Sequence, residues 1–251
     1  MAQSRDQSRL TPRNVSLVLS FAAGYVDSCT FLALFGLFVA QVTGSFVAAG
    51  AQMARGEHGL ILTTFAIPIF LMAGAATTLL VAFANEQRAS PLAHCLALEC
   101  ALLTGFLVAG VSGSPFDGPD APRAVITGLF GLSAMGVQSA LVQLLMRGTP
   151  STNVMTTNTT QLAIAATQAV LFWHAHRKTS GDQAAAQLAS TRDRLKALLC
   201  VAGGFLTGTI AGALAYAIAD LWCVLVPIAA ILGLLIWSLR SPSNLNARST
   251  S

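Results

Sequence analysis

The residue with the clearest chemical potential is Asp27, a carboxylate in the middle of an apolar run from Val15 to Leu34. A carboxylate at the centre of a bilayer costs roughly 2.5–3.5 kcal/mol on insertion scales, so it normally faces the interior of a helix bundle. There it either marks the path of a proton, an ion or a polar solute, or it joins helices through hydrogen bonds. The sequence leaves both interpretations of Asp27 open.

A second carboxylate, Glu99, lies eight residues after Pro91 in another apolar run. It could pair with Asp27 or exchange a proton with it, or it could serve only as a contact between helices. Neither the histidines nor the cysteines follow a metal-ligand spacing. We therefore expect no metal ion and no cofactor.

Amides and hydroxyls gather in three further stretches. Gln41, Ser45, Ala48 and Gln52 repeat at helical spacing and share one face. Such groups can line a path for a neutral or cationic solute, or hold helices together at about 0.6–2 kcal/mol each. The candidate substrate- or ion-binding residues are Asp27, Gln41, Thr43, Ser45, Glu99, Gln138, Ser139, Thr156, Asn158 and Gln161.

The composition indicates what must position these side chains. Hydrophobic residues make up 54% of the 251 residues and charged residues only 10%, whereas soluble domains carry about 25% charge. These values predict an all-α polytopic membrane protein, because helices satisfy their own backbone in lipid. They exclude a nucleic-acid-binding domain, a disulfide-rich secreted scaffold and a disordered chain. No catalytic motif is present, so we do not expect an enzyme.

Apolar segments can be delimited along the whole chain, and we predict about eight transmembrane helices. The second and sixth segments are shorter or more polar, so six spans with two re-entrant segments remain the alternative. The predicted segments are Val15–Leu34, Leu37–Met53, Leu60–Ala84, Pro91–Val111, Ala124–Met146, Val154–Trp173, Leu195–Ala219 and Leu221–Leu239.

The basic residues orient this arrangement. With eight spans and the N-terminus inside, twelve of the fourteen lysines and arginines lie on the inner side, as the positive-inside rule requires. Only Arg88 and Arg147 fall outside. Six spans keep a similar bias, but we expect them to leave Arg147 at membrane depth, which is costly. Both termini are predicted to be cytoplasmic.

The chain shows signs of an internal repeat. Val26-Asp27-Ser28 matches Val137-Gln138-Ser139, and a threonine-containing block follows each of them at similar spacing. Duplicated halves of this kind occur in transporters. The predicted organisation is a basic N-terminus (1–14), a first membrane repeat (15–111), a joining loop (112–123), a second repeat (124–239) with a cytoplasmic loop (174–194), and a polar tail (240–251).

Three glycines, Gly204, Gly208 and Gly212, recur every fourth residue in the seventh segment. A stripe of small residues lets another helix approach closely. The partner helix can belong to the same chain or to a second copy in a homo-oligomer. We expect helix packing here, not a binding site.

Two runs of sequence resemble a known family. GYVDSCTFLALFGLFVAQVTGSFVAAG (24–50) and GVQSALVQLLMRGTPSTNVMTTNTTQLA (136–163) resemble the two conserved blocks of the YoaK-like, domain-of-unknown-function family of bacterial integral membrane proteins. The first run departs from the family pattern at Val42 and Ser45, and the second at Thr157. The resemblance implies a location in the bacterial inner membrane but no assigned activity.

These observations predict a small secondary transporter with an intramembrane carboxylate and a polar solute site between the two repeats. Two alternatives stay open: a passive channel, and a non-transporting membrane scaffold or sensor. The expected partners are the lipid bilayer and a small neutral or cationic solute, and no nucleic acid.

Overall fold

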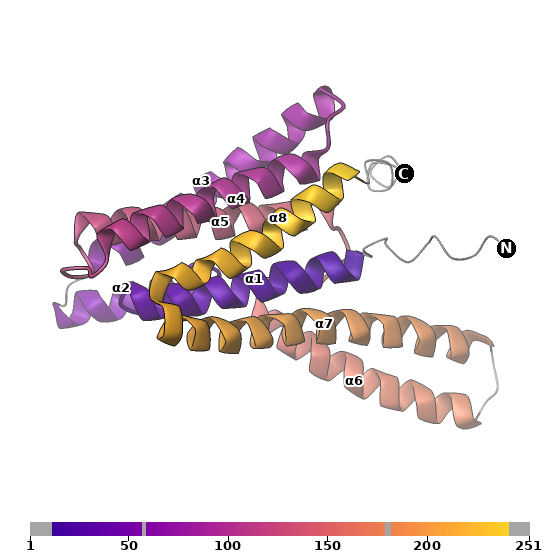
Figure 1. Ribbon diagram of the computed structural model, residues 1–251. Helices are drawn as coiled ribbons and strands as arrows, with labels where there is room; N and C mark the ends of the chain where they lie inside the picture. The colour runs from indigo at the N-terminus through magenta and orange to yellow at the C-terminus, as the bar shows by residue number, and fades with distance from the viewer. Residues whose placement is uncertain (1–11, 57–58, 179–181, 241–251) are drawn as a thin grey trace.

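The computed structural model describes residues 12–56, 59–178 and 182–240, and these residues form helices and connecting segments without a strand (Figure 1). The predicted all-helical class is confirmed. The helices are α1 (Pro12–Ala33), α2 (Gly44–Arg55), α3 (Leu60–Glu86), α4 (Pro91–Gly113), α5 (Pro122–Leu145), α6 (Met155–Lys178), α7 (Asp182–Ala219) and α8 (Leu225–Arg240), with the 3₁₀ helix η1 (Asp220–Val224) between α7 and α8.

Five ranges of the described chain are long and apolar enough to cross a membrane, and neither α2 nor α6 belongs to them. The 12 residues of α2 extend only about 18 Å, whereas the hydrocarbon core measures about 30 Å. The 24-residue α6 is long enough but begins with the polar run from Thr156 to Gln161. The predicted count of eight spans is therefore not supported at its second and sixth segments.

The last of the five ranges, Ala185–Arg240, contains both α7 and α8. The chain reverses direction at η1, so that α8 runs back along the bundle (Figure 1). This range thus provides two antiparallel apolar helices.

The predicted cytoplasmic loop 174–194 is largely helical. The 38-residue α7 begins at Asp182, thirteen residues before the predicted start at Leu195, and α6 continues to Lys178. The run Gln183-Ala-Ala-Ala-Gln-Leu-Ala consists of strong helix formers, so residues predicted to lie in the loop form the beginning of α7. The basic N-terminal segment up to residue 11 and the tail after residue 240 lie outside the described residues.

Close contacts at glycines reveal the directions of the helices. Gly105 and Gly110 of α4 approach Phe130 and Thr127 of α5, so α4 and α5 are antiparallel. In contrast, α3 runs parallel to α5, because Leu62 and Phe70 lie against Gly128 and Gly136, respectively.

The same contacts place α7 beside α1 in parallel. Gly204, Gly208 and Gly212 face the backbone of Leu17, Phe21 and Tyr25 in order. The predicted glycine stripe thus packs within the chain. Gln138 bonds the carbonyl of Leu19 near the start of α1. Asp27, further along α1, bonds Val39, which contacts Gly131, so α1 is antiparallel to α5. It follows that α1, α4 and α7 run one way and α3, α5 and α8 the other (Figure 1).

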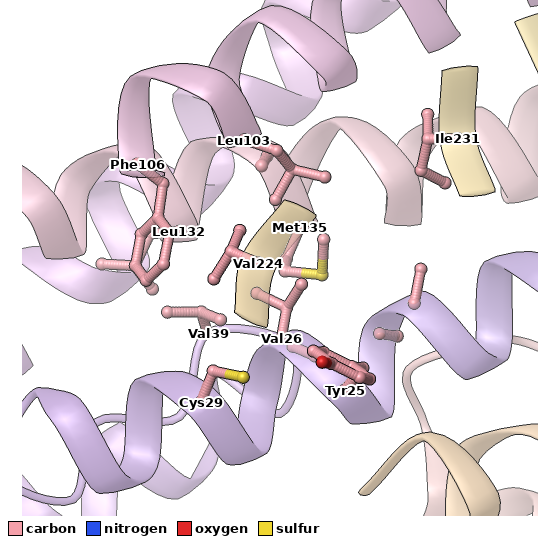
Figure 2. Packing of buried hydrophobic residues seen from close by; sticks show 14 of the residues in the cluster. Tyr25, Val26, Cys29, Val39, Leu103, Phe106, Leu132, Met135, Val224 and Ile231 are labelled. Atoms are coloured by element: carbon pink, nitrogen blue, oxygen red, sulfur yellow. The ribbon is translucent and has the colours of Figure 1, made fainter. Parts of the chain in front are cut away.

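The core lies where α1, α4, α5, η1 and α8 meet (Figure 2). Val39, from the segment that follows α1, lies between Cys29 on one side and Phe106 and Leu132 on the other. The segment after α1 therefore turns back into the bundle. Many large apolar side chains on the outer helix faces remain exposed, among them Ile218 at 87% and Val47 at 76%, as expected for a surface that contacts lipid.

The glycine contacts allow a test of the α1–α7 packing. A Cβ at Gly208 would overlap the backbone carbonyl of Phe21, whereas a Cβ at Gly203 would meet nothing within 4 Å. We expect Gly208→Ala to lower the free energy of unfolding by about 1–3 kcal/mol through overpacking. The control Gly203→Ala should be neutral or stabilising by up to about 1 kcal/mol, because alanine is the better helix former. Thermal unfolding in detergent measures both, and equal effects would contradict the packing.

Candidate functional site

Asp27 holds the segment that re-enters the bundle after α1. The chain turns sharply at Phe35 and Gly36, whose φ angles are +55° and +88°, and then passes back along α1. Oδ1 of Asp27 accepts hydrogen bonds from the backbone N–H groups of Val39 and Ala40, both at 2.8 Å. Buried N–H groups outside a helix need an acceptor, and Asp27, itself only 4% exposed, provides one.

The Asp27 side chain is thus engaged in bonds within its own half of the chain. Of the two interpretations open from the sequence, the structural one has direct support in these bonds. The partner is the backbone of a re-entrant segment and not another helix. No hydrogen bond or ion pair between Asp27 and Glu99 is found within the described ranges, so a pair of the two carboxylates, one of the possibilities open from the sequence, is not seen.

Gln138 plays a corresponding part on α5. Its side chain is fully buried, and Nε2 lies 3.0 Å from the carbonyl oxygen of Leu19, 3.2 Å from Oγ1 of Thr152 and 3.3 Å from Oδ1 of Asn153. Asn153 in turn donates from Nδ2 to the carbonyl of Met135. Gln138 therefore holds the segment before α6, as Asp27 holds the segment before α2.

The remaining candidates lie near these two segments. Ser45 is buried in the first turn of α2, and its Oγ has no hydrogen-bond partner among the described residues. Gln41 is half-buried, and Thr43 is exposed at the N-cap of α2 without a side-chain capping bond. On the other side, Ser139 of α5 is half-buried and Thr156 of α6 is exposed.

A hollow of about 710 Å³ opens between the segment before α6, the first turns of α6 and the N-terminal part of α7. Asn158 and Gln161, both predicted from the sequence, line it, and Nδ2 of Asn158 donates to the carbonyl of Ser151. The other lining residues are Gly148, Thr149, Pro150, Ser151, Val154, Thr157, Asp193, Arg194, Ala197 and Leu198. We call this hollow the inner cavity. Its surface is mixed, with hydroxyls, amides and one charge of each sign.

Asp193 and Arg194 are cavity residues that the sequence did not indicate. The sequence predicts a loop there, whereas the long α7 carries them alongside α6. The helix-forming composition of the residues after Asp182 was the signal that could have placed them on a helix.

Glu99 differs from Asp27 and Gln138 in having no hydrogen-bond partner among the described residues. It is 0% exposed, and neither carboxyl oxygen has a hydrogen-bond partner in the part of the chain that the structure describes. It lies on the buried stripe of α4 that also carries Leu96, Leu103 and Phe106. The same part of the chain contains no group of three or more His, Cys, Asp or Glu side chains that could hold a metal ion.

The contacts of Asp27 generate a prediction for its variants. Asp27→Ala leaves two buried N–H groups without an acceptor, at about 1–3 kcal/mol each, so we expect a total loss of about 2–6 kcal/mol. Asp27→Asn keeps a carbonyl oxygen at the same position and should lose much less. Thermal unfolding of both purified variants measures the difference, and an Asp27→Ala variant as stable as wild type would show that the bonds do not hold the segment.

The comparison with known proteins adds the family. No curated protein and no solved structure matches the chain. A family model described as "Protein of unknown function (DUF1275)" matches residues 15–237, from the first turn of α1 to the last turn of α8. This is consistent with the resemblance to a family of unknown function noted from the sequence. Because the match covers most of the chain, the protein belongs to the DUF1275 family.

Proposed function

We propose that this protein is a small secondary transporter, in which two re-entrant segments form the path of a small polar solute. One observation carries the proposal. Each of two long helices, α1 and α5, holds a non-helical segment, before α2 and before α6 respectively, through a buried polar side chain. Asp27 binds residues 12 and 13 positions downstream, and Gln138 binds residues 14 and 15 positions downstream. Broken helices at corresponding positions of two halves are typical of transporter binding sites.

The helix contacts support the predicted internal repeat. Each first helix packs in parallel against the third helix of the other half, α1 against α7 and α5 against α3. In the same way, α2 packs on α3 and α6 on α7, while α4 packs on α5 and α8 on α1. Because α1 and α5 are antiparallel, this exchange fits two inverted repeats related by an axis in the membrane plane.

These directions favour six crossings, with α2 re-entrant from the outer side and α6 from the inner side. The segments before and after α2 then lie outside, and those around α6 lie inside. Two basic residues, Arg55 and Arg123, become external and twelve become internal: Arg5, Arg9, Arg13, Arg88, Arg147, Arg177, Lys178, Arg192, Arg194, Lys196, Arg240 and Arg248. Arg147 lies two residues after the end of α5 and is exposed, which supports a place at the inner end of α5 in this arrangement.

The six-span and eight-span arrangements have the same charge bias, and four arginines distinguish them. We expect single cysteines at Arg88 and Arg147 to be protected from a membrane-impermeant maleimide in intact cells and labelled after permeabilisation. Cysteines at Arg55 and Arg123 should be labelled in intact cells. The native cysteines are replaced beforehand. The opposite pattern at all four positions would establish eight spans.

The inner cavity suggests the class of solute. Its lining combines threonine, serine, asparagine and glutamine side chains with one carboxylate and one guanidinium. Such a surface hydrogen-bonds a polar solute in several orientations and provides no excess charge of either sign. It favours a neutral polar solute over a cation, within the class expected from the sequence.

A ligand screen tests the solute site directly. A solute that binds only the folded protein raises its stability by about 2.7 kcal/mol at about 100 times its Kd. We expect a compound that binds to raise the melting temperature of the wild-type protein. In Asn158→Ala most of this rise should be lost. Thr159→Ala is the matched control, because Thr159 is exposed one residue further on α6 and its hydroxyl bonds its own helix backbone. Uptake of the hit by proteoliposomes then tests transport.

One observation favours a second candidate, a non-transporting scaffold. The polar side chains that we assign to the two segments are already bonded within the chain, as helix-stabilising groups would be. If no small polar solute shifts the melting temperature and no flux is detected, while Asp27→Ala is destabilised, the scaffold replaces the transporter.

A further inference from the structure

We propose that Glu99 is a reversible proton-binding site, and that Gln138 passes its protonation state to the segment that closes the inner cavity. The proton site stands on the structure of the core alone. Its role in coupling rests on the transporter function proposed above.

The two buried carboxylates differ in their hydrogen-bond partners. Asp27 accepts two short backbone hydrogen bonds, which stabilise its charged form. Glu99 has no partner for either oxygen within the described chain, although it is completely buried. An unpaired buried charge costs several kcal/mol, so Glu99 must hold a proton in this arrangement, and it must reorganise its surroundings when it loses that proton.

The surroundings favour a proton over a metal or alkali cation. The described elements that pack against α4 carry their charged residues at their ends: Glu86 on α3, Arg123 on α5, Asp220 on η1 and Arg240 on α8. The other titratable side chains are Cys223 of η1 and, on α4 itself, His94, Cys95 and Cys100. Hard cations need several oxygen ligands, and within the described residues no group of three or more His, Cys, Asp or Glu side chains that could hold a metal ion forms around Glu99.

The helix register connects Glu99 with Gln138. Gly105 and Gly110 of α4 meet Phe130 and Thr127 of α5, and continuing this antiparallel register places Glu99 level with Val137 and Gln138. Leu103, one turn after Glu99 on the same stripe, and Met135, one turn before Gln138, belong to the same buried cluster (Figure 2). Oε1 of Gln138 is buried and has no partner among the described atoms, so an acceptor is free at the level where a protonated Glu99 has a hydrogen to donate.

The coupling follows from the chemistry of an amide. A protonated Glu99 donates its O–H to Oε1 of Gln138, which keeps Nε2 directed at Leu19, Thr152 and Asn153. When Glu99 gives up this proton to water, it becomes an acceptor only. It then attracts the Gln138 NH₂ group, the amide rotates, and Thr152 and Asn153 lose their donor. The segment before α6, including Ser151 at the cavity wall, is released.

Isotope labelling offers a direct test, because the chain contains only three glutamates: Glu57, Glu86 and Glu99. We propose infrared spectroscopy of the full protein in lipid, prepared with ordinary glutamate and with glutamate carrying heavy carbon at the side-chain carboxyl. At neutral pH we expect a protonated-carboxyl band that shifts with the label. The band should be lost in Glu99→Gln, and it should remain in Glu86→Gln, a control at an exposed position.

The outcomes separate the possibilities. A label-sensitive band that disappears reversibly at alkaline pH supports the proton site, even if Glu99→Gln does not fold, because the labelled wild type decides alone. The absence of such a band at neutral pH overturns the proposal. A solute flux without this band would support the transporter function and contradict a role of Glu99 as its proton site. The band without any flux would support the proton site and contradict the transporter function.

A cysteine reporter tests the coupling. Ser151→Cys in a background without the native cysteines places a thiol on the wall of the inner cavity. Relative to the same reporter with Glu99→Gln, its maleimide labelling should rise several-fold on going from neutral to alkaline pH. A Gln138→Leu variant should show no such rise. An equal pH response with and without Glu99 would overturn the role of Gln138.

Discussion

Where the chain is not helical inside an apolar bundle, its buried backbone N–H groups need hydrogen-bond acceptors. This requirement determines how the segments before α2 and α6 are held. The segment before α2 meets it through Asp27. The segment before α6 is held in a comparable way by Gln138, which bonds the side chains of Thr152 and Asn153. In each case one polar side chain on a long helix fixes a piece of irregular chain in the interior. Non-helical backbone at this depth is tolerated only when it is buried in protein or lines a cavity.

The tight α1–α7 contact gives this arrangement a rigid support. The backbones approach so closely that Gly204, Gly208 and Gly212 leave no room for a side chain. Leu19, whose carbonyl accepts from Gln138, lies on the same stretch of α1. The helix that carries Asp27 is thus fixed by α7 on one side and linked to α5 on the other. The segments before α2 and α6 are therefore both attached to the same group of packed helices.

The buried polar groups fall into two kinds, those that have hydrogen-bond partners in the described chain and those that have none. Asp27 is engaged, and its removal should be felt mainly as lost stability. Glu99, the side-chain oxygen of Gln138 and the hydroxyl of Ser45 are free of partners within the described chain. Buried polar groups are nearly always hydrogen-bonded, and two of these exceptions, Glu99 and Gln138, are the groups on which the proposed proton site rests.

The sequence by itself determined the helical membrane class, the boundaries of most apolar segments and the identity of Asp27, Glu99 and Gln138 as unusual residues, because apolar length and misplaced polar groups are visible locally. Only the tertiary structure showed that neither α2 nor α6 is among the ranges long and apolar enough to span, that Asp27 binds backbone and not Glu99, and that α7 brings Asp193 and Arg194 to the cavity. The charge bias could not decide the number of spans, because the proposed six-span arrangement places twelve basic residues inside and two outside, the same numbers as eight spans. Hydrogen-bond partners depend on how the chain turns between helices, and neither periodicity nor composition records that.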